Sequence, residues 1–439
     1  MYNPRKLSII VYVGAVAMLF GGLFTYISNQ VMMRSCENIF MIDLGLMGLL
    51  ALTLATALLK VNDLATTSTT QASGLTALAV IISAASPAIF ARLVIAFFSS
   101  ASGSSAGFYI PVSIMIPGFV SVAAISIYVA VKQNRRIYSD DNEYSLVQTP
   151  FNKAVLFWAM IVTSLAIFGL SVAIFMERWY LYHVVTANFH AIMLFATGIL
   201  GLIAHEKQVV DLGVWTKTFT NFTAGISAAS TIAMVQTLVR YANQPGDTKW
   251  ERLDFTILTL CQTLFTFIGL ILSSVAIVAT DDVLNKAPKP TKSSDIDTMN
   301  VGMLVSASVA GAVAIFNMAI MNYPVYGFPP VAVAIMVIVT ARHGIDIQTT
   351  DNGIAKYPYY VLSIFNSFGS IWAISMSVYE FLAHASYQTS LLKTFFFFRY
   401  AFGSITILSL IPVAYFSIKS AIRSSKDVDN LNNGSIPIV

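Results

Sequence analysis

The chain has 439 residues, of which 56% are hydrophobic and only 10% are charged. Soluble globular proteins carry about 25% charged residues, so this composition excludes an ordinary soluble protein and predicts one surrounded by the lipid bilayer. The net charge of +4 comes without a long basic run, and nothing in the sequence indicates nucleic-acid binding.

Twelve segments are apolar enough for transmembrane helices, each of which needs about 20 mainly apolar residues. The sequence therefore predicts an all-α integral membrane protein, with the tenth segment the shortest of the set. The segments are residues 7–28, 39–59, 74–98, 108–131, 154–176, 187–204, 218–240, 254–280, 300–322, 328–341, 359–384 and 394–418.

The distribution of lysines and arginines predicts how these segments are oriented in the membrane. With the N-terminus placed inside, seventeen of the 25 basic residues lie in inner segments and six in outer ones, and Arg92 and Arg399 lie within spans. Basic residues accumulate on the cytoplasmic side of membrane proteins, so both termini are predicted to be cytoplasmic. No small-residue cleavage site follows the first segment, which is expected to remain as an anchor. The sequence does not distinguish a location in the plasma membrane from one in an internal membrane.

Long polar connections divide the twelve segments into three sets of four. The connections are residues 132–153 and 281–299. They predict three membrane units, residues 1–145, 146–294 and 295–439, the last with a short cytoplasmic tail. Because four spans return the chain to the side where it started, the three units would share one orientation and be parallel.

Short sequence similarities favour an internal repeat of these units. The sequence ISAAS at residues 82–86 recurs at 226–230, and NSFGS stands in the corresponding place at 366–370. Small residues let helices approach closely in lipid, so Ser83, Ser86 and their counterparts are predicted helix-contact positions. The alternative is that small-residue runs recur by chance in helices rich in alanine and serine.

Six ionisable residues lie in the outer third of predicted spans, one acid and one base in each unit. A charge at the centre of a span costs about 2.5–3.5 kcal/mol, so such residues are candidates for function. Two interpretations are open: ion pairs that fix the helices, or an outward-facing polar cavity that binds a solute or ion. The pairs are Asp43 with Arg92, Arg240 with Asp254, and Glu380 with Arg399. Arg92 is the deepest charge and the strongest single candidate.

No pattern of an enzyme, metal site or cofactor site is present. The sequence contains no Walker loop, no G-x-S-x-G and no H-E-x-x-H. Cys36 and Cys261 are far apart in the sequence, so neither a disulfide framework nor a zinc site is indicated. The five histidines stand near the ends of predicted spans, and we expect them to be interfacial rather than ligands.

These features favour a transporter-like protein that moves a small solute or ion through an outward-facing polar cavity. The rival interpretation is a scaffold or accessory subunit that binds other membrane proteins or lipids through small-residue helix faces. A transporter predicts a polar path that passes the outer third of the membrane. A scaffold predicts a packed interior and paired charges.

Overall fold

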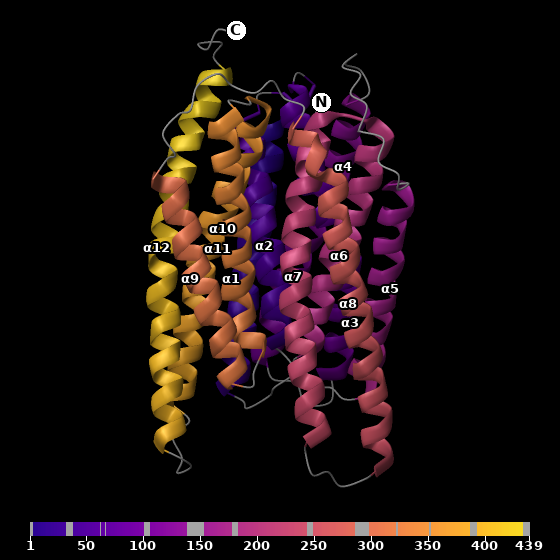
Figure 1. The fold of residues 1–439 in the computed structure, drawn as a ribbon, viewed down its shortest axis with the longest axis vertical. Coiled ribbons are helices and arrows are strands. Elements are labelled where there is room, and N and C mark those ends of the chain that lie inside the picture. Colours follow the sequence, from indigo (N-terminus) through magenta and orange to yellow (C-terminus); the bar gives the residue numbers. More distant parts are fainter. Residues whose placement is uncertain are drawn as a thin grey trace. The chain divides into compact units, whose positions relative to one another are not determined.

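The computed structural model describes residues 3–31, 38–61, 63–65, 67–100, 106–137, 153–177, 183–243, 249–285, 298–321, 324–350, 353–386 and 393–432, with only the backbone described at several helix ends. This part of the chain consists of helices and short connections and contains no strand (Figure 1). The helices are α1 (Pro4–Val31), α2 (Asn38–Leu59), α3 (Thr69–Ser100), α4 (Ala106–Arg136), α5 (Lys153–Glu177), α6 (His183–Lys207), α7 (Val210–Asn243), α8 (Lys249–Asn285), α9 (Thr298–Met321), α10 (Pro324–Thr350), α11 (Gly353–Ser386) and α12 (Lys393–Asn432).

The prediction of a multi-pass membrane protein is confirmed by the lengths and composition of these helices. Eleven of them contain a described stretch long and apolar enough to cross a membrane, and α2 has a shorter described apolar stretch, Gly45–Leu59. Several helices exceed the predicted spans. The helix α10 begins before residue 328 and ends after residue 341, and α12 runs on to Asn432. Hydropathy detects the apolar part of a helix, whereas polar turns can continue it into water.

The chain forms two compact units, Met1–Thr280, which contains α1–α7 and most of α8, and Asp281–Val439, which contains α9–α12. We call them unit 1 and unit 2. The predicted division into three four-helix units stays a prediction, because α1–α7 and most of α8 fall within one compact unit.

Unit 1 contains two groups of helices. In the first group, α1–α4, helix α1 contacts α2 and α4, and α3 also contacts α2 and α4, so the four helices form a closed ring. In the second group, α5–α8, helix α6 contacts both α5 and α7. Helix α3 joins the two groups by packing against α6 and α7.

The first group contains a very close approach of two helices. A Cβ atom added to Gly14 of α1 would lie 2.8 Å from the carbonyl oxygen of Gly118 in α4. A Cβ atom on Gly118 would lie 2.9 Å from the carbonyl oxygen of Gly14. Small residues permit such contacts, which favour helix association where the hydrophobic effect cannot.

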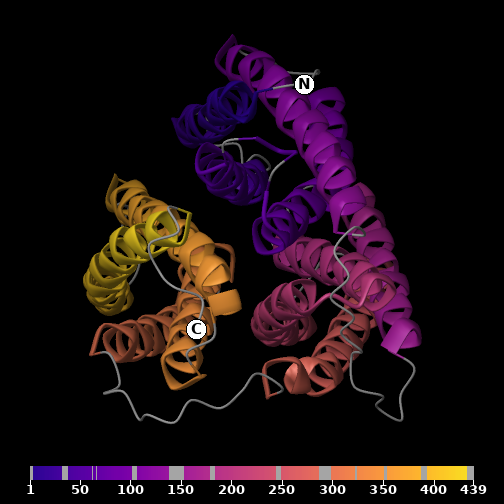
Figure 2. The same cartoon turned by 90° about the horizontal axis from the view of Figure 1, so that it is seen from above.

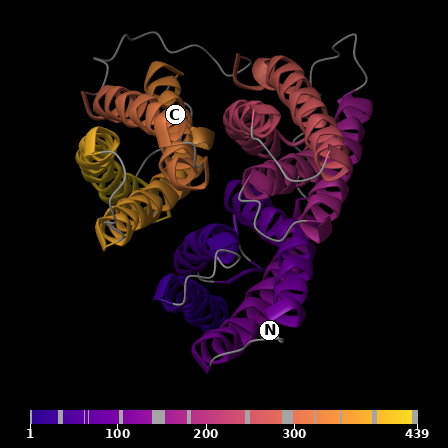
Figure 3. The same cartoon turned by 90° about the horizontal axis from the view of Figure 1, so that it is seen from below.

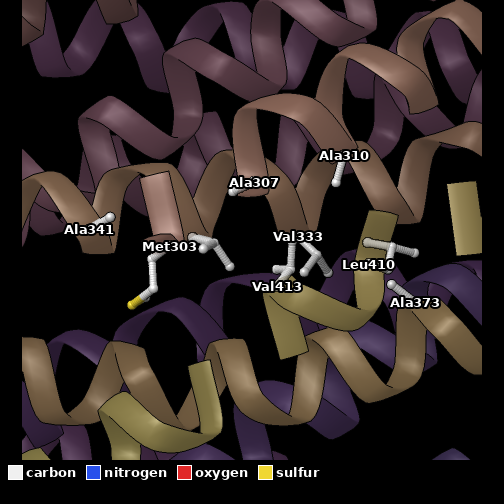
Figure 4. Close-up of a cluster of buried hydrophobic side chains, with 9 residues drawn as sticks. Met303, Ala307, Ala310, Val333, Ala341, Ala373, Leu410 and Val413 are labelled. Atoms are coloured by element: carbon white, nitrogen blue, oxygen red, sulfur yellow. The ribbon is translucent and has the colours of Figure 1, made fainter. Parts of the chain in front are cut away.

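Unit 2 is a four-helix ring. Helix α9 contacts α10 and α12, and α11 contacts the same two helices. The views from above and below show the four helices, coloured orange to yellow, around a common centre (Figure 2 and Figure 3). Apolar side chains from all four helices fill this centre (Figure 4). They are Met303, Ala307, Ala310, Val333, Val337, Ala341, Ala373, Leu410 and Val413.

Candidate functional site

The structure places the backbone of all six predicted charged residues within helices. Their side chains lie outside the described residues, so neither ion pairing nor exposure to a cavity is tested, and both stay predictions. The residues are Asp43 in α2, Arg92 in α3, Arg240 in α7, Asp254 in α8, Glu380 in α11 and Arg399 in α12.

Helix α7 carries five buried hydroxyl side chains on one face, which we call the hydroxyl stripe. Steps of three and four residues place side chains above one another on a helix. With a rise of about 1.5 Å per residue, the stripe covers about 21 Å of a hydrocarbon core that is about 30 Å thick. Each of the five side chains is at most 1% exposed: Thr216, Thr220, Thr223, Ser227 and Ser230.

Helix α6 presents polar groups to the C-terminal half of this stripe. The hydroxyl of Ser230 donates to the backbone carbonyl of Thr186, with 2.9 Å between the oxygens. The hydroxyls of Thr197 and Thr223 lie 2.8 Å apart and share a hydrogen bond. The predicted helix-contact role of the serines is thereby confirmed for α7, where Ser230 binds α6 directly.

His190 lies between these two contacts and is completely buried, with 0% of its surface exposed. His190 is therefore enclosed by other helices, whereas the expectation that it lies at the depth of the membrane interface stays a prediction. His190 stands near the start of α6, but α7 and α8 pack against its side chain and bury it. Its Nε2 atom lies 2.6 Å from the Ser227 hydroxyl oxygen.

The hydrogen bonds of Ser227 assign the tautomer of His190. The Ser227 hydroxyl is also 2.7 Å from the backbone carbonyl oxygen of Thr223, to which it can only donate. Since a serine has one hydroxyl proton, its oxygen then accepts from the Nε2–H group of His190. This arrangement leaves Nδ1 as an acceptor, and Nδ1 has no hydrogen-bond partner among the described residues.

Helix α8 completes the surroundings of the imidazole. A Cβ atom on Gly269 would lie 2.7 Å from Cε1 and 2.8 Å from Nε2 of His190, so a larger residue here would force the imidazole to move. Residues at steps of three and four along α8 form one face, which is polar apart from Gly269 and Ala276. Its residues, each at most 4% exposed apart from the glycine, are Thr259, Gln262, Thr266, Gly269, Ser273 and Thr280.

The polar interior is held in place by α5 and by an apolar cluster. The side-chain amide of Gln262 donates to the Ser171 hydroxyl of α5 over 2.6 Å. Apolar contacts join α5, α6, α7 and α8 around it. These contacts come from Phe157, Met160, Ile167, Ala187, Ala191, Leu194, Met234 and Ala276. Within the described residues, no cluster of three His, Cys, Asp or Glu could hold a metal ion.

A second buried ionisable group lies near the start of α7. Asp211 is 7% exposed, and its Oδ2 atom accepts a hydrogen bond of 3.0 Å from the Thr70 hydroxyl of α3. Its other oxygen, Oδ1, has no partner in the described part of the chain. This contact joins the first and second groups of unit 1.

Replacing Thr70 by valine should destabilise unit 1 by about 1–3 kcal/mol, because the buried Asp211 carboxyl would lose its hydrogen-bond donor. The measurement is the apparent melting temperature of the purified protein in detergent. Thr76→Val is the matched control, since the Thr76 hydroxyl is buried on the same helix without a partner among the described residues. Equal melting temperatures for the two variants would contradict the prediction.

The polar interior was not predicted from the sequence, although serine and threonine recur at helical spacing in residues 216–230. This spacing indicates one polar helix face, but the partner of that face could not be deduced from α7 alone. The position of Gly269 against His190 depends on the packing of α8, for which the sequence offered no signal.

The chain matches no protein family model, no curated protein and no solved structure. These comparisons therefore indicate no activity, substrate or partner for the chain. The buried polar interior of the second group is the feature from which a function can be inferred.

Proposed function

We propose that the protein is a membrane transporter that moves a small solute or ion along the polar interior between α6, α7 and α8. The observation that carries the proposal is the hydroxyl stripe together with the buried His190. Polar and ionisable residues inside a membrane are expensive, and in known membrane proteins they mark pathways for solutes, ions and protons.

Unsatisfied polar atoms favour transport over a purely structural role. His190 Nδ1, Thr259 Oγ1 and Gln262 Oε1 are buried in this interior and lack hydrogen-bond partners among the described residues. A buried polar group without a partner costs about 1–3 kcal/mol. A scaffold would gain nothing from that cost, whereas water or a polar solute in the path would supply the missing partners.

The outer charges belong to the same proposal. Arg240 and Asp254 lie near the predicted outer ends of α7 and α8, the two helices that carry polar stripes. Charges at the mouth of a path attract solutes of opposite sign and raise their local concentration. Arg92 in α3 and Asp43 in α2 would act on the first group in the same way.

We also propose that the three sets of four helices are copies of one parallel unit. The rings of α1–α4 and α9–α12 close through the same neighbours in chain order, which supports this. A fully buried threonine also recurs at nearly equal spacings in the second helix of each set. These residues are Thr53 in α2, Thr197 in α6 and Thr340 in α10.

Water access to the hydroxyl stripe tests the transport proposal. In a background with Cys36→Ser and Cys261→Ser, Ser227→Cys and Ser230→Cys should react with a small membrane-impermeant thiol reagent added to intact cells. A path open to water delivers the reagent to these positions, whereas a sealed protein interior excludes it. Labelling is measured by a mass shift of the purified protein.

Two cysteine controls define the background of this measurement. Ala191→Cys lies in the apolar cluster of α6, and Val278→Cys lies on a face of α8 where the valine is 73% exposed. Both should stay unlabelled, the first because it is packed and the second because lipid covers it. Failure of Ser227→Cys and Ser230→Cys to label above these controls would overturn the transport proposal and favour a scaffold.

Asn3→Cys, exposed before α1, should react only in inside-out vesicles if the N-terminus is cytoplasmic.

A further inference from the structure

We infer that the path selects hydrogen-bond donors, so that its cargo is a small neutral or cationic solute with N–H or O–H groups and not an anion. The inference rests on the proposed function, because it names the chemical class of the cargo for the same path. It goes beyond that function by excluding every anion.

The hydroxyl stripe of α7 offers lone pairs rather than protons. The hydroxyls of Thr216, Thr220 and Ser227 each donate to the backbone carbonyl four residues earlier, over 2.7–2.8 Å. Ser230 donates instead to the Thr186 carbonyl of α6. A hydroxyl has one proton and two lone pairs, so these four side chains can only accept a hydrogen bond from a solute.

The polar face of α8 has the same character. The hydroxyls of Thr266, Ser273 and Thr280 donate to the backbone carbonyl four residues earlier, over 2.7–2.8 Å. Thr259 differs, since its hydroxyl has no partner among the described residues and keeps its proton for a solute. The described faces of α7 and α8 therefore present mostly acceptors to the path.

Two further atoms of the path can only accept hydrogen bonds. They are Nδ1 of His190, in the tautomer assigned above, and Oε1 of Gln262, and neither has a partner among the described residues. Gly269, which lies against His190, stands seven residues after Gln262, so the two acceptors lie about 10 Å apart along α8. A solute with N–H or O–H groups would satisfy first one acceptor and then the other.

No buried side chain in the described part of the path carries a positive charge for an anion. Apart from Asp211, which binds Thr70 of α3, the buried polar side chains described in α6, α7 and α8 are hydroxyls, amides and one imidazole. Pores for anions use rings of lysine or arginine to replace the lost hydration. A neutral or cationic solute instead needs lone pairs, which this path supplies.

Uptake of three solutes into liposomes tests the inference. Urea, guanidinium and nitrate share one small planar shape, but urea and guanidinium carry N–H donors, whereas nitrate carries only acceptors. The full-length protein is reconstituted, and entry of each isotope-labelled solute is measured with the same unlabelled solute on both sides of the membrane. Urea or guanidinium should enter faster than into protein-free liposomes, and nitrate should not. The donor that enters distinguishes a neutral cargo from a cationic one.

Threonine-to-valine variants, which keep the side-chain shape, test the acceptors themselves. Thr220→Val and Thr266→Val each remove one acceptor from the path, so each should lower the rate of entry about threefold to tenfold, the effect of one hydrogen bond. The two changes lie on different helices, so a folding defect in one leaves the other informative.

Thr218→Val is the matched control and should keep the wild-type rate. The Thr218 hydroxyl is also buried and donates to the Val214 carbonyl over 2.9 Å. Because it stands two residues from Thr220, it lies on the opposite side of α7 and outside the hydroxyl stripe.

The outcomes separate this inference from the transport proposal. Nitrate entry as fast as that of the donors, exclusion of both donors, or wild-type rates in both Thr220→Val and Thr266→Val would overturn the inference. An equal loss of rate in Thr218→Val would overturn it as well. If Ser227→Cys is nevertheless labelled by the thiol reagent, the path exists and transport of another species stands. If Ser227→Cys is sealed and none of the three solutes enters, both proposals fail together.

Discussion

Gly118→Ala should destabilise the first group of helices by about 1–3 kcal/mol, the usual cost of overfilling a packed site. The added Cβ atom would lie 2.9 Å from the Gly14 carbonyl oxygen and 3.0 Å from the Ala17 Cβ atom. These atoms belong to the backbone or are fixed to it, so no side-chain rotation relieves the contact and α1 must move away from α4. Alanine is the better helix former by about 1 kcal/mol, which offsets only part of the cost.

Gly169→Ala in α5 is the matched control for this effect. Nothing lies within 4 Å of the position that its Cβ atom would take, so the helix-propensity gain is not opposed by a collision. The apparent melting temperature in detergent, followed by the loss of the monodisperse peak on size-exclusion chromatography, should fall for Gly118→Ala and hold or rise for Gly169→Ala. A Gly118→Ala variant at least as stable as Gly169→Ala would show that α1 and α4 are not in close contact.

The helices of this protein could be predicted because a membrane span is a local property. About 20 apolar residues in a row are sufficient evidence for a span, and neighbours in space do not alter it. Hydropathy did not predict where helices such as α12 continue beyond their apolar part. The polar turns there have the same hydropathy as the polar connections that follow them.

The candidate site could be predicted only in part, because burial of a polar residue depends on which helix covers it. Ser227 and Ser230 were identifiable as contact positions from their small size. His190 stands only seven residues after the start of α6, and a position so near a helix end is usually interfacial. Its burial comes from Ser227 of α7 and Gly269 of α8, which are distant in the sequence. Pairing of Arg92 with Asp43 depends on two helices in the same way and remains a prediction.

Tyr359→Phe should destabilise unit 2 by about 2–4 kcal/mol, because one hydroxyl joins polar groups from three helices. The Tyr359 hydroxyl of α11 donates to the Asn300 side-chain oxygen of α9 over 2.6 Å and accepts from the Ser420 hydroxyl of α12 over 2.8 Å. Asn300 is 2% exposed and Ser420 is fully buried. Phenylalanine has the same shape without the hydroxyl, so the expected loss comes from hydrogen bonds rather than packing.

Tyr415→Phe in α12 separates this loss from a general effect of removing a tyrosine hydroxyl. Tyr415 is 57% exposed on the outer wall, where its hydroxyl is not enclosed by the protein. Hydrogen–deuterium exchange of the backbone should rise in α9–α12 for Tyr359→Phe and stay unchanged in α1–α8, because the two units are separately compact. Tyr415→Phe should leave both regions unchanged. Faster exchange throughout α1–α12 in Tyr359→Phe would mean that the units unfold together, and unchanged exchange in α9–α12 would mean that the hydroxyl does not stabilise unit 2.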